Sequence, residues 1–309
     1  MRNTKKLAAL TGGLFSGFFS GLFLLFIFTF LLFSSCASSP VGSVSESVPV
    51  PEKVQPNWQP LEVIGLDYFA GKISSPKIKF HSLRIDLSAP ELQIFTAGGM
   101  NGTKSTKVST FVRDNNLLAG INALPFDPVS GKEGEPRTNI GLVIANGKMI
   151  SPPYSGFDAL VFYTSTDNSS VIAAIVPQSK IQSAENIQNA VGGFHRILEA
   201  NEHVPRVVNL SARHPRSAAG ISQDGRFLYL LVIDGRRPGS IGATEKETAM
   251  LLQALGASEG INFDGGGSSA LAIRSRNGKV KVLNKPIHGG IIGKERAVAG
   301  CLGIMRNEE

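Results

Sequence analysis

Two segments of this chain share one design, in which a largely apolar run ends in an aspartate that glycine follows. Residues 228–233 lead into Asp234, and residues 260–263 lead into Asp264. One glycine follows the first aspartate, and three consecutive glycines follow the second. A strand end can hold such a carboxylate rigidly at the rim of a pocket, because the strand fixes its backbone. The sequence therefore predicts a polar site built from the ends of strands.

Basic residues accompany both aspartates. Arg213, His214 and Arg216 precede a segment rich in Ala and Gly, and Arg236 follows the first aspartate. The guanidinium group is a planar fork of donors that matches phosphate oxygens. The glycines at 265–267 let a ligand approach the backbone and present N–H groups to an anion. These features predict an anion site, and Arg216 is the residue most expected to contact a phosphate. The structural alternative is a glycine turn without a ligand beside a basic loop exposed to solvent.

Local patterns predict a strand-rich fold. Residues 77–87 alternate polar and apolar side chains as a half-buried strand does, and Asn-Gly at 146–147 is typical of a type I′ hairpin turn. Residues 107–116 predict a short helix, and residues 244–255 predict a longer one that begins with a Thr-x-x-Glu capping box. Many short strands and few helices indicate the α+β class, with mixed, largely antiparallel sheets and a few packed helices.

The N-terminus predicts export. A few basic residues precede an uncharged stretch rich in Phe and Leu, so residues 1–35 are interpreted as a signal peptide or a membrane anchor. Cys36 follows two serines, which indicates the lipidation site of a bacterial lipoprotein, and a single uncleaved membrane helix is the alternative. Both interpretations predict an exported protein that is anchored to the membrane in the bacterial cell envelope.

Composition indicates one folded region behind a spacer. Residues 36–60 are rich in Ser, Val and Pro without a helical or strand period, which is typical of a flexible spacer, and the domain is expected over 61–309. The chain has 309 residues, 42% of them hydrophobic, enough to build a core.

The net charge of the chain, +7, falls to +4 without Arg2, Lys5 and Lys6. Since basic runs interleaved with aromatic residues are missing, no nucleic-acid partner is expected.

Several kinds of site find no support in the sequence. It contains no His and Cys spacing for zinc, no Gly-x-Ser-x-Gly segment and no Walker loop. No cofactor is expected, although the side-chain oxygens of Asp234, Asp264 or Asn122 leave a divalent cation open. Cys301 lies in an apolar segment, so it is expected to be a buried, inert thiol rather than a nucleophile.

Taken in order, these blocks resemble the phosphodiester glycosidase family over residues from about 107 to the C-terminus. The resemblance is carried by Ala-Val-Gly-Gly at 190–193, Pro-Arg-Ser-Ala-Ala-Gly at 215–220, Asp-Gly-Arg at 234–236, Asn-Phe-Asp-Gly-Gly-Gly-Ser at 262–268, Asn-Lys-Pro at 284–286 and Glu-Arg at 295–296. One block departs, because Asn122, Ala123 and Leu124 stand where the family usually has Asn-Gly-Gly. Ala123 and Leu124 are therefore expected to narrow the pocket.

The resemblance implies hydrolysis of the bond between the anomeric carbon of a sugar and a phosphodiester. Departure of the phosphate leaves positive charge on the sugar, so such a site needs cations around the phosphate and a carboxylate near the anomeric carbon. The predicted catalytic residues are Asp264 at the anomeric carbon or the attacking water, Asp234 as a general base, and His214 as a proton shuttle. The predicted substrate-binding residues are Arg216 and Arg236 for the phosphate, Asn122 for sugar hydroxyls, and Asn262, Gly265, Gly266, Gly267 and Ser268.

A rival hypothesis keeps the fold without the chemistry. The altered block at Asn122 and the predicted membrane tether also suit a noncatalytic envelope lipoprotein that binds a glycan or phosphoglycan. A third hypothesis, a scaffold protein of the envelope, would give the charged residues of these blocks no function. The joint presence of Arg216, Asp234, Arg236 and Asp264 favours an enzyme whose partner is a sugar phosphate or phosphoglycan.

Overall fold

The structure is a computed structural model that describes residues 54–98, 103–129, 132–164, 171–205 and 212–307. The chain divides into two compact units, Met1–Glu46 and Ser47–Glu309, and the described residues all belong to the second. The predicted signal peptide or anchor at 1–35 and the lipidation site Cys36 lie outside the described residues. Within the described ranges, no helix has both the length and the apolar character needed to cross a membrane.

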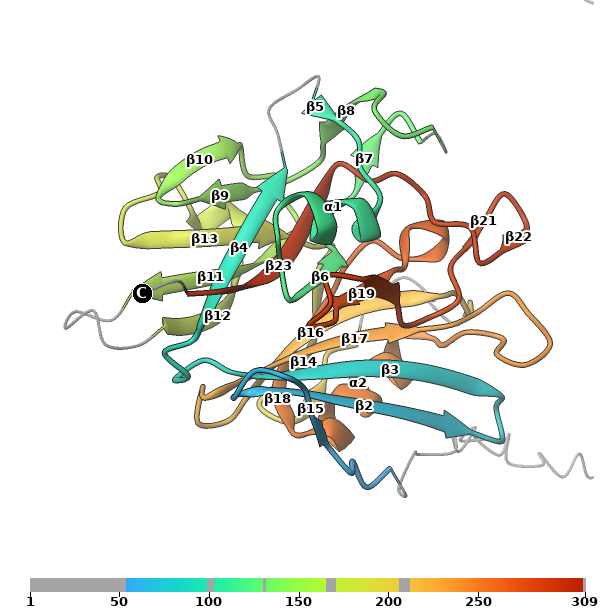
Figure 1. Ribbon diagram of the computed structural model, residues 1–309. Coiled ribbons are helices and arrows are strands. Elements are labelled where there is room, and N and C mark those ends of the chain that lie inside the picture. The colour runs from blue at the N-terminus through green and yellow to red at the C-terminus, as the bar shows by residue number, and fades with distance from the viewer. Residues whose placement is uncertain (1–53, 99–102, 130–131, 165–170, 206–211, 308–309) are drawn as a thin grey trace, which may run out of the picture. The chain divides into compact units, whose positions relative to one another are not determined.

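The largest sheet has eight strands in the order β1-β2-β3-β17-β16-β18-β14-β15 (Figure 1). These strands are β1 (Gln59–Pro60), β2 (Leu66–Ile73), β3 (Ile78–Asp86), β14 (His195–Glu199), β15 (Glu202–His203), β16 (Arg216–Ser222), β17 (Phe227–Ile233) and β18 (Ala257–Asn262). The central strand β17 is a continuous apolar run because both of its faces are buried: Leu230 packs in one hydrophobic cluster and Leu231 in another.

Two further sheets have five strands each. One runs β10-β9-β13-β11-β12 and consists of β9 (Val143–Ala145), β10 (Lys148–Ser151), β11 (Asp158–Thr164), β12 (Val171–Pro177) and β13 (Ile187–Gly192). The other runs β20-β19-β6-β23-β4 and consists of β4 (Leu92–Gly98), β6 (Ala119–Asn122), β19 (Leu271–Arg274), β20 (Val280–Val282) and β23 (Gly300–Arg306).

Short strands complete the architecture. A three-stranded sheet runs β5-β8-β7, from β5 (Thr103–Lys104), β7 (Phe126–Asp127) and β8 (Pro136–Asn139), and a separate hairpin pairs β21 (Ile287–His288) with β22 (Ile291–Ile292). The prediction of largely antiparallel sheets is confirmed. The mixed character is not found, because every pair of named strands in the described ranges is antiparallel.

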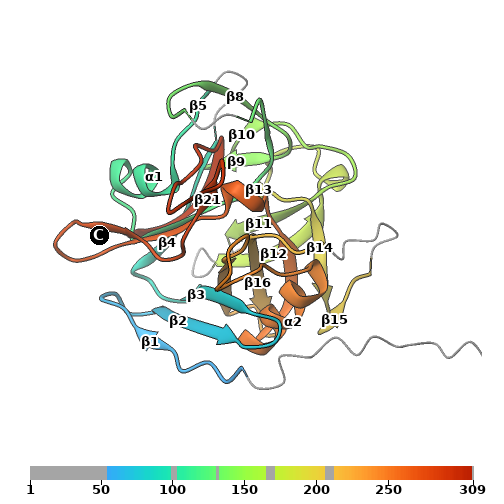
Figure 2. The same ribbon diagram turned by 90° about the vertical axis from the view of Figure 1, so that its right-hand side faces the viewer.

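Helices are few, as the α+β prediction requires. The described residues hold two α-helices, α1 (Val108–Asp114) and α2 (Glu245–Leu255), and two 3₁₀ turns, η1 (Gln178–Lys180) and η2 (Gly266–Ser268). Helix α2 begins with the predicted capping box, in which Thr244 and Glu247 exchange hydrogen bonds of 2.9 and 3.1 Å. Figures 1 and 2 show α2 lying against the eight-stranded sheet.

One hydrophobic core is shared by all three large sheets. It includes Leu230 of β17, Ile121 of β6 and Leu160 of β11, each without exposed surface. The sheets converge at strand ends, since the backbone N–H of Asp264, beyond β18, donates to the carbonyl of Ala123, directly after β6 of another sheet, at 2.7 Å. The N–H of Phe263 donates to the carbonyl of Ser217 on β16, the neighbour of β18, at 2.9 Å. The predicted site therefore lies where β6, β16 and β18 meet.

The packed structure begins before Leu61. The Trp58 ring lies 5.9 Å from that of Phe69 and 6.0 Å from that of Tyr229, and the Arg84 guanidinium lies 5.1 Å above it. The last residues of the predicted spacer at 36–60 are thus part of the folded unit.

The hairpin turn at 146–147 is confirmed by its positive φ angles of 48° and 74°.

Candidate active site

Asp264 lies two residues beyond the end of β18, and both its backbone N–H and its carbonyl are hydrogen-bonded. Its N–H donates to the carbonyl of Ala123 at 2.7 Å, and its carbonyl accepts from Nδ2 of Asn122 at 2.6 Å. The side-chain oxygen of Asn122 accepts from Oγ of Ser217 at 2.7 Å and from the N–H of Ala270 at 3.1 Å. Asn122 is buried. The hydrogen bonds of its side chain connect β6 to β16 and to the segment after β18, and all of these partners are protein groups.

The Asp264 carboxyl is set to titrate close to neutral pH. The residue keeps some accessible surface, yet protein atoms surround its carboxyl, and this burial raises the pKa of Asp264 to about 6. A hydrogen bond from the Ser268 side chain, the charge of Arg296 and the N–H of Gly265 oppose the rise in pKa. A carboxyl whose pKa lies near neutral pH, on a residue that keeps some accessible surface, is typical of a catalytic group.

Two glycines of the loop at 265–267 lie against arginine side chains. A Cβ on Gly266 would lie 2.9 Å from Nη2 of Arg236, and a Cβ on Gly267 would lie 2.5 Å from Nη2 of Arg296. Gly266 also has a φ of +61°, which disfavours other residues. The glycine run is therefore needed so that two guanidinium groups can lie directly on the loop.

Arg216 lies beside the same loop, but its guanidinium has partners in the protein. A Cβ on Gly265 would come 3.9 Å from Cδ of Arg216. Nε donates to the carbonyl of Ala243 at 3.0 Å, Nη2 to that of Ala212 at 3.2 Å, and Nη1 lies 3.5 Å from Oε1 of Glu245. The side chain is 9% exposed, and burial lowers the pKa of Arg216 against the opposing charge of Glu245.

Arg236, by contrast, is exposed. Its φ of 56° lies in the left-handed region, which costs about 1 kcal/mol for a residue with a side chain. Its Nη2 lies 3.5 Å from Nδ1 of His214. Burial and the charges of Arg216 and Arg236 lower the pKa of His214, so this imidazole is neutral at neutral pH.

Arg296 is a site residue that the sequence analysis did not include. Its Nη1 donates to Oγ of Ser268 at 3.2 Å, and its Nε donates to Nδ1 of His288 at 3.1 Å. Burial and the Arg296 charge lower the pKa of His288, while the Asp264 charge opposes the burial that lowers the pKa of Arg296. The Glu-Arg pair at 295–296 was the signal that could have identified it.

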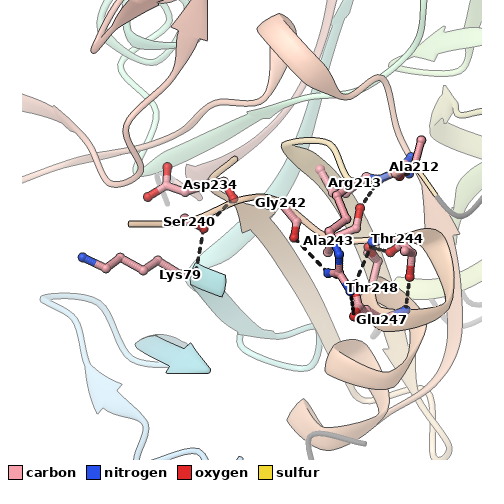
Figure 3. Close-up of polar contacts among 11 residues, drawn as sticks. Lys79, Ala212, Arg213, Asp234, Ser240, Gly242, Ala243, Thr244, Glu247 and Thr248 are labelled. Carbon is pink, nitrogen blue, oxygen red and sulfur yellow. Dashed lines mark hydrogen bonds and ion pairs between the residues drawn. The ribbon is translucent and has the colours of Figure 1, made fainter. Parts of the chain in front are cut away.

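Asp234 is fully buried, at 1% exposure. Its Oδ1 accepts from the N–H of Lys285 at 2.8 Å, and its Oδ2 accepts from the guanidinium of Arg237. Figure 3 shows Ser240 beside it: Oγ donates to the Asp234 carbonyl at 2.7 Å and accepts from the N–H of Lys79 at 2.9 Å. These contacts tie the loop after β17 to β3 and to residue 285, and none of them involves residues 264–268.

Asn262, another predicted binding residue, belongs to a buried polar cluster under the N-terminus of α2. Its Nδ2 donates to Oε1 of Glu245 at 3.4 Å, and Oε2 of Glu245 lies 2.5 Å from Nε2 of His195. Arg216 contacts the same carboxylate. Through Arg216, which lies beside Gly265, this cluster borders the loop at 265–267.

Ala123 and Leu124 do not narrow the pocket as expected. Both side chains are buried in the shared core. A Cβ on Gly300 would lie 2.1 Å from Cδ2 of Leu124, so Leu124 fills the space above this glycine of β23. Their side chains extend into the core and not toward solvent.

The sequence left open a divalent cation held by side-chain oxygens of Asp234, Asp264 or Asn122. Among the described residues, no three or more His, Cys, Asp and Glu side chains gather as a metal site. Asp234 and Asn122 use their side-chain oxygens on protein donors, and Asp264 faces Arg296. The oxygens suggested for a cation thus face N–H and O–H donors.

Comparison with known proteins gives one family match and several solved structures of similar fold. The model of a family described as phosphodiester glycosidase matches residues 115–305. The catalytic domain of zebrafish N-acetylglucosamine-1-phosphodiester α-N-acetylglucosaminidase, auto-inhibited by its pro-peptide, is 18% identical with a TM-score of 0.59, over 82% of this chain and 87% of that chain.

Two bacterial structures share the fold. A protein of Burkholderia pseudomallei, described as exported, is 17% identical with a TM-score of 0.56, over 74% of each chain. A hypothetical protein from Synechocystis is 14% identical with a TM-score of 0.55, over 82% of this chain and 64% of that one. No curated protein matches the sequence.

Proposed function

Because the chain belongs to the phosphodiester glycosidase family, we propose that it hydrolyses the bond between the anomeric carbon and the phosphate of a glycosyl 1-phosphodiester. One observation carries the proposal: Asp264, Arg236 and Arg296 meet at a single glycine loop. The loop joins a carboxyl group to two cations, and this is the combination that departure of a phosphate from a sugar requires.

Arg236 and Arg296 bind the phosphate in this proposal. Arg236 is exposed and Arg296 is partly exposed, and both lie against the loop at 265–267. Each lowers the pKa of a neighbouring histidine, so the local field is positive and stabilises an anion. A phosphodiester monoanion fits this field better than an uncharged glycoside does.

Asp264 acts on the sugar side. Above its pKa of about 6 it is ionised and stabilises the positive charge that develops at the anomeric carbon. The oxygen of a water molecule forms a bond to that carbon while the bond to the phosphate oxygen breaks, and the electron pair leaves with the phosphate. Asp264 takes the proton of the water. Phosphate is a good leaving group, so a protonating acid is not required.

The other predicted residues hold these groups in place. Asn122 fixes the backbone of Asp264, and Asp234 fixes the loop that carries Arg236. Arg216 and Asn262 share the carboxylate of Glu245 beneath the loop. His214 lies beside Arg236, and the lowered pKa of its imidazole favours the neutral form. We assign to it the transfer to solvent of the proton that Asp264 takes from the water.

The proposed location is the bacterial cell envelope. The predicted signal peptide or anchor at 1–35 and lipidation at Cys36 support an exported, membrane-anchored protein. One structural neighbour is described as exported, which agrees with this location. The proposed partners are accordingly a sugar phosphate or phosphoglycan and the membrane.

The test is release of free sugar by the full chain. The substrates are methyl phosphodiesters of glucose, galactose, mannose and N-acetylglucosamine 1-phosphates in both anomers, together with UDP-N-acetylglucosamine. Release that Asp264→Asn abolishes and that the surface change Asp114→Asn preserves supports the proposal. Binding of these compounds without release would overturn it in favour of a noncatalytic glycan-binding lipoprotein.

A further inference from the structure

A small hairpin borders the candidate active site. In it, Ile287 of β21 pairs with Ile292 of β22, and His288 pairs with Ile291. Gly289 and Gly290 form the turn, with φ angles of 60° and 77°. A Cβ added at either glycine, or at position 293, would meet no atom within 4 Å. The end of the hairpin therefore stands in open space, and Figure 1 shows it extending away from the strands of the sheets.

The hairpin presents apolar and cationic side chains together. Ile291 and Ile292 are each 55% exposed, and Lys285 and Lys294 on either side are exposed as well. Residues 285–294 contain no Asp or Glu. Two adjacent isoleucines held out on a projecting turn are unfavourable in water, so a cluster of this kind marks a contact surface.

This surface is continuous with the proposed phosphate site. Strand β21 packs against the η2 turn, which contains two of the loop glycines. His288 accepts a hydrogen bond from Arg296, the guanidinium that lies on Gly267. Lys294 adds positive charge near the same imidazole. A group bound by Arg296 would therefore have the hairpin as its neighbour.

We propose that this hairpin binds the aglycone of the substrate and that the aglycone is an apolar chain. The substrate class is then a glycosyl phosphate of a lipid alcohol. Isoleucine side chains offer no hydrogen bonds, so a sugar or nucleoside aglycone would lose its hydration there without compensation. An alkyl chain would cover both isoleucines, and the lysines would face the phosphate end. The inference rests on the proposed function, because it assigns the other end of the same substrate.

The experiment compares two diesters of the sugar 1-phosphate that the full chain hydrolyses. One carries a methyl group and the other an octyl group, and both are assayed in the same detergent buffer. Covering the exposed parts of two isoleucines predicts an octyl-to-methyl ratio of kcat/KM of roughly ten or more. In Ile291→Thr/Ile292→Thr the ratio falls toward one, while kcat/KM for the methyl diester stays unchanged. Threonine keeps the β-branched shape that the hairpin strand favours.

A matched control removes an isoleucine of similar exposure elsewhere. Ile172 on the edge strand β12 is 52% exposed, and Ile172→Thr is expected to leave the ratio as in the wild type. Equal turnover of the methyl and octyl diesters by the wild type would overturn the inference and leave the proposed function intact. An octyl preference that survives in the double variant would also overturn it. Failure to hydrolyse any diester would overturn the proposed function, and the inference with it.

Discussion

Asp264 keeps some accessible surface, while the burial of its carboxyl favours the uncharged form. Burial raises its pKa from the ordinary 3.8 to about 6, a difference that corresponds to ~3 kcal/mol. Because the folded-state pKa is raised, the stability contribution is fully present below the unfolded pKa and is lost as the pH rises through 6. At neutral pH the ionised carboxylate therefore destabilises the fold, as catalytic groups often do.

Replacing Asp264 by Asn is expected to exchange activity for stability. Turnover falls ~10²–10⁴-fold because the carboxylate is lost. At about pH 7.5 the variant is more stable than the wild type by up to ~3 kcal/mol, and near pH 4 the gain largely disappears, because the wild-type carboxyl is then protonated. Denaturant unfolding at the two pH values measures the difference. A stability gain that is equal at both would contradict the assignment of the raised pKa.

The rate should depend on pH through the same group. If Asp264 acts as the ionised form, kcat/KM rises with pH and reaches half of its plateau near pH 6. An initial-rate profile from about pH 4.5 to 8 measures this limb. A profile that rises toward low pH instead would indicate that the protonated carboxyl is the active form.

Arg296 contributes its planar fork as well as its charge, since it donates to Ser268 and His288 at once and occupies the space that a Cβ on Gly267 would need. In Arg296→Lys the charge remains but the fork is lost, so KM for the diester is expected to rise ~10-fold. Arg113→Lys, a change at a surface position, serves as the control. Wild-type KM in Arg296→Lys would exclude Arg296 from phosphate binding.

The glycine loop is the element that assembles the site. Gly267 has no need of a positive φ, so its role is steric: a Cβ there would meet the Arg296 guanidinium at 2.5 Å. The side-chain amide of Asn284 fixes the segment that follows the loop. It accepts from the N–H of Leu271 at 3.1 Å and donates to the carbonyl of Ser269 at 2.9 Å.

A methyl group at Gly267 should therefore displace Arg296 while leaving the fold in place. Gly267→Ala is expected to lower kcat/KM ~10- to 100-fold, the worth of one charge-assisted hydrogen bond. Gly239→Ala is the matched control, because a Cβ there meets nothing closer than 3.5 Å. Steady-state kinetics measure kcat/KM of both variants. Equal values would show that the close approach of Arg296 to Gly267 is not needed.

Local elements could be predicted from the sequence because their signals are local. The Asn-Gly turn and the capping box of α2 each depend on residues within a few positions of one another. Cys301 was expected to be buried from its apolar segment; it is buried, and this raises the pKa of its thiol. Strand-end aspartates were likewise found after β17 and β18.

Contacts between distant segments could not be predicted in the same way. Arg296 reaches Ser268 across 28 positions, and Asn122 reaches Asp264 across 142. The sequence shows that Asp234 and Arg237 are near in the chain, but not that their ion pair is buried. Pairing of this kind depends on how three sheets converge, which no local pattern encodes.

At the scale of the whole molecule, the folded unit extends to residues before the predicted boundary. A chain starting at Leu61 lacks Trp58 and its contacts with Phe69 and Tyr229. It is expected to be about 2 kcal/mol less stable than a chain starting at Val54 and to melt roughly 5 °C lower. Circular dichroism melts of the two chains measure this, with Trp58→Ala in the longer chain as a second reference. Coincident melts would place the boundary at Leu61.

The central claim is that the chain breaks the bond to the anomeric carbon and uses Asp264 to do so. Hydrolysis of a glycosyl 1-phosphodiester in water enriched in a heavy oxygen isotope tests it most directly. The isotope is expected in the released sugar and not in the phosphate, and the reaction is expected to stop in Asp264→Asn. Isotope in the phosphate would mean that water attacks phosphorus, and it would contradict the assignment of Asp264 to the sugar.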